Sequence, residues 1–159
     1  MPGKVVQIFI CPTKGQPMEE VAEVYASRET GLKGDRYGMG EGSWSRPHNK
    51  TSRQVSLIAV EAIAAANEKL LTPILSIETR RNIVVEGVDL NALVSKEFSI
   101  GEVRLLGTKL CEPCERPAFL AGRTVEERRL FPIAFDNQGG LCAEIVVDGF
   151  MRPTDSIVV

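Results

Sequence analysis

The stretch Glu97–Pro117, EFSIGEVRLLGTKLCEPCERP, carries both a strand pattern that decides the fold and two closely spaced cysteines. Two apolar runs, Glu97–Ile100 and Val103–Leu110, are separated by Gly101. Short apolar runs bounded by turn residues are typical of β-strands, so the stretch predicts two successive strands. The cysteines follow the second strand, at the point where it gives way to a loop.

Similar runs recur along the rest of the chain, and turn residues separate many of them. They predict further strands at Val5–Ile10, Val21–Ala26, Gln54–Ala59, Asn82–Glu86, Leu141–Val147 and Ser156–Val159. Two helices are predicted, one at Val60–Leu71 and one at Thr124–Phe131, where Thr124 and Glu127 form a capping-box pattern and Pro132 limits the helix. Strands and helices do not alternate regularly, which favours a β-rich barrel or sandwich of mixed α/β content over a doubly wound parallel sheet.

Length and composition favour one globular domain over residues 1–159, with a hydrophobic core of its own. The net charge of −2 argues against nucleic acid as the main partner, although a local basic pocket for an anion fits it. No run approaches the roughly 20 apolar residues that span a bilayer, and the run at Val5–Cys11 is interpreted as a strand and not as a signal peptide. We therefore expect a cytoplasmic protein with reduced thiols and no membrane partner.

Cys111 and Cys114 leave four interpretations open: a metal clip, a redox dithiol, a disulfide, or one functional thiolate beside an inert neighbour. A closed zinc site needs about four ligands, and Cys11 and Cys142 are isolated in sequence, as buried filler often is. A thioredoxin-type dithiol needs a parallel α/β context that the pattern lacks. A disulfide is rare in the cytoplasm.

The single-thiolate interpretation is supported by the basic residues nearby in sequence. Arg116 lies two residues after Cys114, and Lys109 and Arg123 are close along the chain. Positive neighbours favour the thiolate, which is the form that attacks or that ligates a soft metal.

Three further motifs place basic residues beside turns or strand ends. TGLKGDRYG at Thr30–Gly38 contains two glycines, Lys33 and Arg36; TSRQVSLI at 51–58 contains Arg53; ETRRNIVVEGVDL at 78–90 contains adjacent arginines and an asparagine. Glycine turns and arginines suit phosphate or carboxylate groups. Taken alone, the first and third motifs are more typical of a solvated turn or loop than of a site, and Arg53 is equally typical of a surface arginine. His48, the single histidine, is interpreted as an exposed loop residue or as part of a pocket lid.

The ordered set of motifs resembles the MOSC domain, named from the C-terminal domain of molybdenum-cofactor sulfurase. The motifs follow one another in the order GLKGDRYG, RQVSLI, RRNIVVEGVDLNAL, FSIGEVRLLGTKLCEPCERP and MRPTDSIVV. The resemblance as a whole runs from about Val5 to the last residue. The resemblance implies a distorted β-barrel with a few helices, related to the barrel domain of pyruvate kinase. Many relatives have a histidine where this chain has Tyr37.

The resemblance also implies a function for the cysteines and basic residues. It assigns Cys114 as the catalytic thiolate and molybdenum ligand, with Cys111 as the variable neighbour, and molybdenum cofactor as the bound group. The residues expected to hold the cofactor are Lys33, Gly34, Asp35, Arg36, Arg53, Arg80, Arg81, Asn82 and Arg116.

The expected activity is reduction of small N-hydroxylated or N-oxide compounds by a molybdenum-dependent oxidoreductase. No ferredoxin-like extension is visible, so separate electron-donor proteins are expected as partners of a reductase. No aminotransferase-like segment is visible either, so the chain is not expected to generate sulfur itself. Two alternatives are a sulfur carrier with a persulfide on Cys114, served by a sulfur donor and acceptor, and a cofactor-binding module without turnover.

Overall fold

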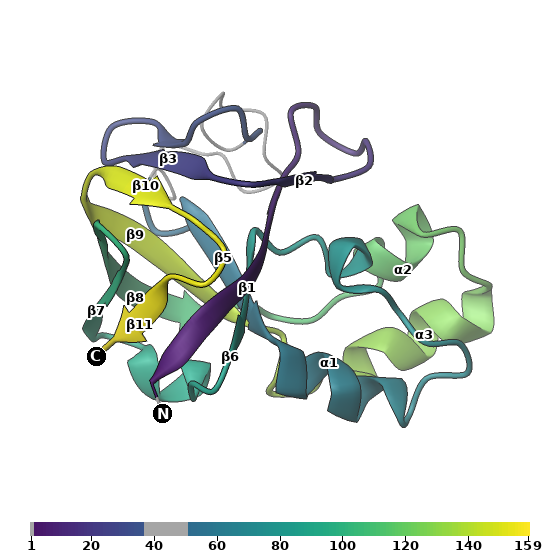
Figure 1. Cartoon of the computed structure of the whole chain (residues 1–159). Coiled ribbons are helices and arrows are strands. Elements are labelled where there is room, and N and C mark those ends of the chain that lie inside the picture. The colour runs from purple at the N-terminus through teal and green to yellow at the C-terminus, as the bar shows by residue number, and fades with distance from the viewer. Residues whose placement is uncertain (1, 37–50) are drawn as a thin grey trace.

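Seven strands close into a barrel in the computed structural model, which describes residues 2–36 and 51–159 (Figure 1). Around the barrel they follow the order β1, β6, β5, β9, β8, β7, β11, and β11 pairs back onto β1. A short strand, β2 (Glu19–Val21), extends the sheet beyond β1. The barrel strands are β1 Gly3–Ile10, β5 Val55–Ala59, β6 Ile83–Glu86, β7 Glu97–Ile100, β8 Val103–Leu110, β9 Leu141–Val147 and β11 Ser156–Val158. The β-rich barrel expected from the sequence is confirmed.

The pairing of β5 with β6 is parallel, whereas the other described pairs of the barrel are antiparallel. A parallel pair needs a long crossover, which here runs through α1 (Val60–Asn67) and the 3₁₀ turn η2 (Ser76–Thr79). Because both strands run the same way, the residues that precede them lie at the same end of the barrel. Arg53 and the pair Arg80–Arg81 are therefore brought together by topology.

Alternation along the strands divides the apolar residues into two cores. In β5 and β9, Val55 and Leu57 face the barrel interior together with Leu141 and Ala143, which are their register partners. Successive side chains of a strand point to opposite faces, so Ser56 and Cys142, paired between them, lie on the outer face.

Helices cover part of the outer face and form the second core. Ile58 and Val84 of the sheet pack there with Ala62 and Ile63 of α1 and with Phe131. Figure 1 shows α1, α2 (Arg116–Leu120) and α3 (Val125–Ala134) gathered on one side of the barrel. No helix among the described residues has the length and apolar character needed to cross a bilayer.

Several predicted boundaries were wrong. The single strand expected at Val21–Ala26 is two strands, β2 and β3 (Val24–Ser27), which belong to different sheets. β3 pairs with β10 (Gly149–Met151) and β4 (Gly31–Leu32) in a small sheet, and neither partner was predicted. Apolar residues alternate in the same way whichever sheet a strand belongs to, so periodicity alone could not show where the chain changes sheets.

Both predicted helices are present with different ends. α1 stops at Asn67, whose side chain accepts from the Ile74 backbone N–H at 2.8 Å and donates to its carbonyl at 3.2 Å. α3 is capped by Thr124, which accepts from the Glu127 N–H at 3.2 Å, but it continues through Pro132 to Ala134. α2 was not predicted, because five residues carry no measurable periodicity.

One buried amide joins the strands beside the crossover. Asn82 is 2% exposed, and its Oδ1 accepts from both the backbone N–H and the hydroxyl of Ser56, each at 3.1 Å. Its Nδ2 donates to the Phe9 carbonyl at 3.1 Å and to Asp35 Oδ1 at 3.3 Å. One side chain thus links β1, β5 and the segment that follows β4.

We expect Asn82→Ala to lower the free energy of unfolding by about 3 kcal/mol, because several buried polar groups lose their partner at once. Urea unfolding of the purified protein measures the change. Asn91→Ala, which removes one hydrogen bond to the Asn137 carbonyl, is the matched control and should cost about 1 kcal/mol or less. Equal losses in the two variants would contradict the linking role of Asn82.

Candidate functional site

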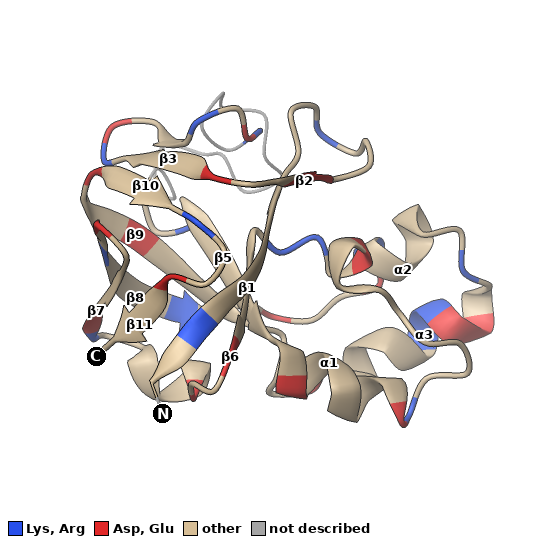
Figure 2. Ribbon diagram, in the orientation of Figure 1, with Lys and Arg blue, Asp and Glu red and all other residues tan. Residues whose placement is uncertain are grey.

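A cavity of about 170 Å³ opens on the outer face of the barrel, beside the start of β5 and β6. Ten residues from distant parts of the chain line it: Arg36, Arg53, Ser56, Arg80, Arg81, Cys111, Glu112, Pro113, Cys114 and Cys142. Acidic and basic positions are interspersed along the ribbon in Figure 2, and the net charge is −2. The four arginines therefore make a local positive site in a protein without an overall positive charge.

The end of β8 and the start of β9 place two of the cysteines side by side. Lys109 is the register partner of Cys142, and the Cys111 N–H donates to the Gly140 carbonyl at 2.8 Å. A side chain at Gly139 would collide with the Cys111 carbonyl, so glycine is required for this close approach. The Sγ atoms of Cys111 and Cys142 are 3.1 Å apart.

The electrostatics of this thiol pair are unequal. The hydrogen bond between the two thiols, together with Arg81, Arg53 and Lys109, outweighs the effect of burial and lowers the pKa of Cys111 to about 6. The same hydrogen bond, together with burial and the Cys111 charge, raises the pKa of Cys142. Cys111 is therefore the more acidic of the two thiols.

Two arginines stand next to the thiol pair. Arg81 donates from Nε to the Gly139 carbonyl at 2.9 Å, which ties it to the segment that precedes Cys142. Arg53 approaches Cys142 Sγ with Nη1 at 4.0 Å. Both guanidinium groups are thus directed to the wall of the cavity that the thiols form.

The other two arginines form the opposite part of the wall. Arg80 has a positive φ of 63°, which is uncommon for a residue with a side chain, and donates to the Gln16 carbonyl at 2.9 Å and to Cys11 Sγ at 3.4 Å. Burial and the charges of Arg36 and Arg116 lower the pKa of Arg80, and the Cys11 thiol opposes them. The cations are therefore close enough to repel one another.

Asp35 lies behind this wall and is completely buried. Gly34, with a φ of +86°, makes the turn that directs Asp35 inward. The carboxylate accepts from the Cys11 backbone N–H at 2.8 Å and lies 3.7 Å from Nη1 of Arg36. Asp35 thus fixes the arginine that follows it.

The structure gathers part of the predicted site. Of the residues expected to hold a cofactor, Arg36, Arg53, Arg80 and Arg81 line the cavity with Cys114. Asp35 and Asn82 lie behind it with their polar atoms bonded to protein groups, and the exposed Lys33 and Gly34 do not line it. That any of them binds a cofactor stays a prediction. Tyr37 and His48 lie outside the described residues.

Arg116 and Arg123 have different surroundings from those that sequence proximity suggested. Arg116 is close to Arg80 and approaches Gly15. Arg123 is held by Glu78 at 3.2 Å and by Glu127 at 3.4 Å, where it links α3 to η2. Arg123 is therefore paired with carboxylates of η2 and α3.

The alternatives for the cysteines can now be compared. All four cysteines are free thiols, and only Cys114 is exposed. Cys11 is directed toward Arg80 and the carbonyl of Thr13, at 2.9 Å. No group of three or more His, Cys, Asp or Glu residues suited to a metal occurs among the residues that the structure describes. The described residues therefore do not form the four-ligand zinc site.

Sequence reasoning missed four residues of the cavity: Cys142, Ser56, Glu112 and Pro113. Cys142 carried a usable signal, because the double glycine at 139–140 precedes it and such a pair often permits a close approach of two backbones. Ser56 lay within the TSRQVSLI motif, but it was not identified as a site residue because apolar residues surround it in the sequence. Glu112 and Pro113 stand between the two cysteines of the loop, and no local pattern marks them as residues of a cavity.

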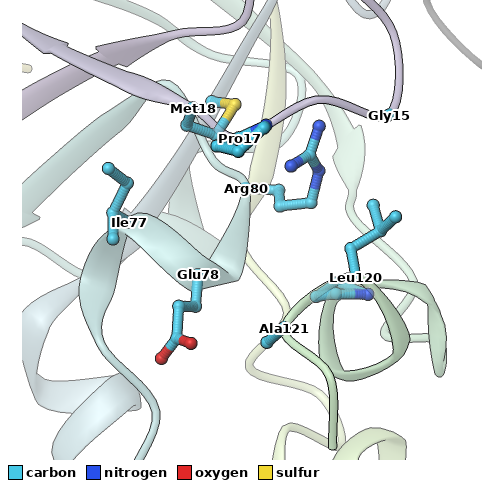
Figure 3. A pocket seen from close by; sticks show the side chains of 9 residues that line it. Gly15, Pro17, Met18, Ile77, Glu78, Arg80, Leu120 and Ala121 are labelled. Atoms are coloured by element: carbon cyan, nitrogen blue, oxygen red, sulfur yellow. The ribbon is translucent and has the colours of Figure 1, made fainter.

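A second cavity of about 220 Å³ adjoins the first and shares Arg80 with it. Figure 3 shows the Arg80 side chain between the Gly15–Pro17 segment and Leu120, with Met18 and Ile77 completing the apolar wall. Glu78 also lines this space, but it is already paired with Arg123. The second cavity is thus mainly apolar, with one cation at its edge.

Comparison with known proteins agrees with the fold. The MOSC domain sequence model matches residues 45–158. A YuaD protein structure from Bacillus subtilis superposes with a TM-score of 0.83 at 20% identity, over 99% of this chain and 94% of that one. The structure of YiiM from Geobacillus stearothermophilus superposes with a TM-score of 0.71 at 14% identity, over 99% of this chain and 74% of that one. The structure of YiiM from Escherichia coli superposes with a TM-score of 0.63 at 15% identity, over 99% of this chain and 67% of that one. No curated protein sequence matches the chain.

The thiol pair predicts a measurable titration. In a Cys114→Ser background, one thiolate should form with a midpoint near pH 6, because the hydrogen bond with Cys142 and the nearby arginines lower the pKa of Cys111. Replacing Cys142 by Ala as well removes the donor and should move the midpoint toward the ordinary thiol value of 9.0. The ultraviolet absorbance of the thiolate, followed against pH, measures both. Identical midpoints in the two proteins would contradict the pairing.

Proposed function

Because the chain belongs to the MOSC domain family, we propose that it binds molybdenum cofactor in the arginine-lined cavity, with Cys114 as the thiolate ligand of the metal. The observation that carries the proposal is the convergence of Arg36, Arg53, Arg80 and Arg81 on one cavity that also contains an exposed thiol. The family supplies the candidate ligand, and the cavity supplies the chemistry to hold it.

The side chains that line the cavity suit both the phosphate group and the metal of such a cofactor. Guanidinium groups bind phosphate through paired, charge-assisted hydrogen bonds, and four of them line the cavity. A thiolate is a soft ligand, which suits a soft metal centre better than a carboxylate would. Cys114 is the exposed thiol of the described cysteines and is therefore the one most open to a ligand that enters from solvent.

The volume of the cavity limits the size of the ligand that the described residues can enclose. Pockets for whole cofactors usually have about 300–1,000 Å³, whereas this cavity has about 170 Å³. The adjoining second cavity, with about 220 Å³, shares Arg80 and extends the available space. We assign the cation-rich cavity to the anionic and metal-bearing part of the cofactor.

The proposed activity is the reduction of small N-hydroxylated or N-oxide compounds. When bound, the cofactor would supply two-electron removal of an oxygen atom, with electrons from separate donor proteins. The protein's own residues would hold the cofactor: Cys114 fixes the metal, Arg53 and Arg81 hold negative charge near it, and Asp35 keeps Arg36 in place. A cytoplasmic location is part of the proposal and fits the four free thiols.

Sulfur transfer is the second candidate function, and the thiol cluster favours it. Three thiols line one cavity, and Cys114 is exposed, as a residue that receives sulfur from another protein must be. In this function Cys114 carries a persulfide, and the arginines stabilise its negative charge. The third possibility, a binding module without turnover, uses the same contacts to the cofactor.

Metal and pterin contents test the leading proposal. Wild type and Cys114→Ala are expressed in a host that makes molybdenum cofactor, then analysed for molybdenum and for oxidised-pterin fluorescence. We expect near-stoichiometric molybdenum in the wild type and its loss in Cys114→Ala. Cys111→Ser is the matched control and should retain the metal. Equal loss in both variants would contradict a single thiolate ligand. No molybdenum in the wild type, with a persulfide on Cys114, would establish the sulfur carrier.

Arginine substitutions test the proposed phosphate contacts. Arg53→Gln should lower pterin retention by about tenfold or more, because a charge-assisted hydrogen bond contributes about 1.5–3 kcal/mol. Arg104→Gln is the control, since Arg104 is exposed on β8 and paired with Glu97 at 3.0 Å. Thermal unfolding of both variants checks that the fold is intact. Unchanged retention in Arg53→Gln would exclude this arginine from the cofactor site.

A further inference from the structure

We propose that Cys111 and Cys142 form an oxidation site: a dithiol that a small hydroperoxide converts into a disulfide, which thiols then reduce. The proposed function assigns no role to Cys111 or Cys142, although these two residues line the same cavity as Cys114. The site also differs from the Cys111–Cys114 dithiol that the sequence spacing suggested. The structure gives Cys111 a different partner, 31 residues away along the chain.

The geometry favours this pair over the other combinations. Cys111 and Cys142 Sγ atoms are 3.1 Å apart, and a disulfide requires about 2.05 Å, so an approach of roughly 1 Å closes the bond. The Cys111 backbone is tied to Gly140 by a 2.8 Å hydrogen bond, which holds the two segments together. Cys11 contacts Arg80 and the Thr13 carbonyl, away from this pair.

Access to the pair is through the cavity. Cys111 is 5% exposed and Cys142 is 2% exposed, but both line the 170 Å³ space that Cys114 also lines. A water molecule occupies about 30 Å³ in the liquid, so a hydroperoxide with two oxygen atoms can enter. The cavity is therefore large enough to admit a small oxidant.

The surroundings favour reaction at Cys111. Arg53 and Arg81 face the pair, and together with the hydrogen bond from Cys142 they favour the Cys111 thiolate. The thiolate is the reactive form of cysteine, whereas the thiol is not. Cys142 keeps its proton and is placed to act second.

The reaction balances with hydrogen peroxide as the oxidant. The Cys111 thiolate attacks one peroxide oxygen, the O–O bond breaks, and the hydroxide that leaves takes a proton from solvent to become water. Cys142 Sγ then attacks the Cys111 sulfenic acid; the S–S bond forms, the S–O bond breaks, and the Cys142 proton leaves with the hydroxide as a second water. The two sulfurs lose two electrons, which reduce the peroxide. The product no longer carries the thiolate charge, so the arginine-lined cavity becomes more positive.

Disulfide mapping on the full chain tests the proposal. Reduced wild type and Cys114→Ser are treated with hydrogen peroxide and then unfolded in the presence of an alkylating agent. Both proteins are digested for peptide mass spectrometry. We expect a Cys111–Cys142 disulfide in both proteins, its loss after dithiothreitol, and Cys11 alkylated throughout. The wild type alone gives this result, so the test does not depend on the folding of a variant.

A Cys142→Ser variant identifies the first step. Without its partner, Cys111 should accumulate as a sulfenic acid that dimedone labels. A Cys111–Cys114 disulfide in the oxidised wild type would overturn the proposal. Full alkylation of Cys111 and Cys142, after a peroxide dose that oxidises free glutathione, would also overturn it.

Discussion

Mutual repulsion among four arginines around one small cavity is the constraint on which the rest of the site depends. Two unit charges 4 Å apart repel by about 4 kcal/mol when the effective dielectric constant is about 20. The effect is visible at Arg80, whose pKa is lowered by burial and by Arg36. Such a cluster persists only when negative or polar groups surround it.

The protein supplies these groups from different directions. Asp35 lies behind Arg36, the Gly139 carbonyl accepts from Arg81, and the Gln16 carbonyl accepts from Arg80. The Cys111 thiolate faces Arg53 and Arg81 inside the cavity. Most of these partners hold the arginines from behind, so the positive charge stays directed to the cavity. A ligand with concentrated negative charge satisfies such a site better than a neutral one.

Local patterns predicted much of the fold, because strand formation depends on the near sequence. The hairpin at Glu97–Leu110 and the cap at Thr124 appear as expected. Barrel closure between β11 and β1 could not be predicted, since it joins the two ends of the chain. The same applies to the site: the motifs identified the arginines, but the pairing of Cys111 with Cys142 depends on the register of β8 and β9. Arg123 shows the limit of sequence proximity, since it is close to the cysteines along the chain but pairs with Glu78 and Glu127.

The structure separates its cysteines by environment, and the separation explains how one cavity can contain three thiols. Cys114 is exposed on the loop and open to ligands or partner proteins, whereas Cys111 and Cys142 are buried against each other. In the reduced pair the thiolate offsets part of the arginine charge; without it the same arginines would repel one another more strongly. The state of the buried pair and the affinity of the cavity for anions are therefore coupled through Arg53 and Arg81. Such coupling needs no movement of the backbone, because the charge of the thiol pair changes at a position that the two arginines already face.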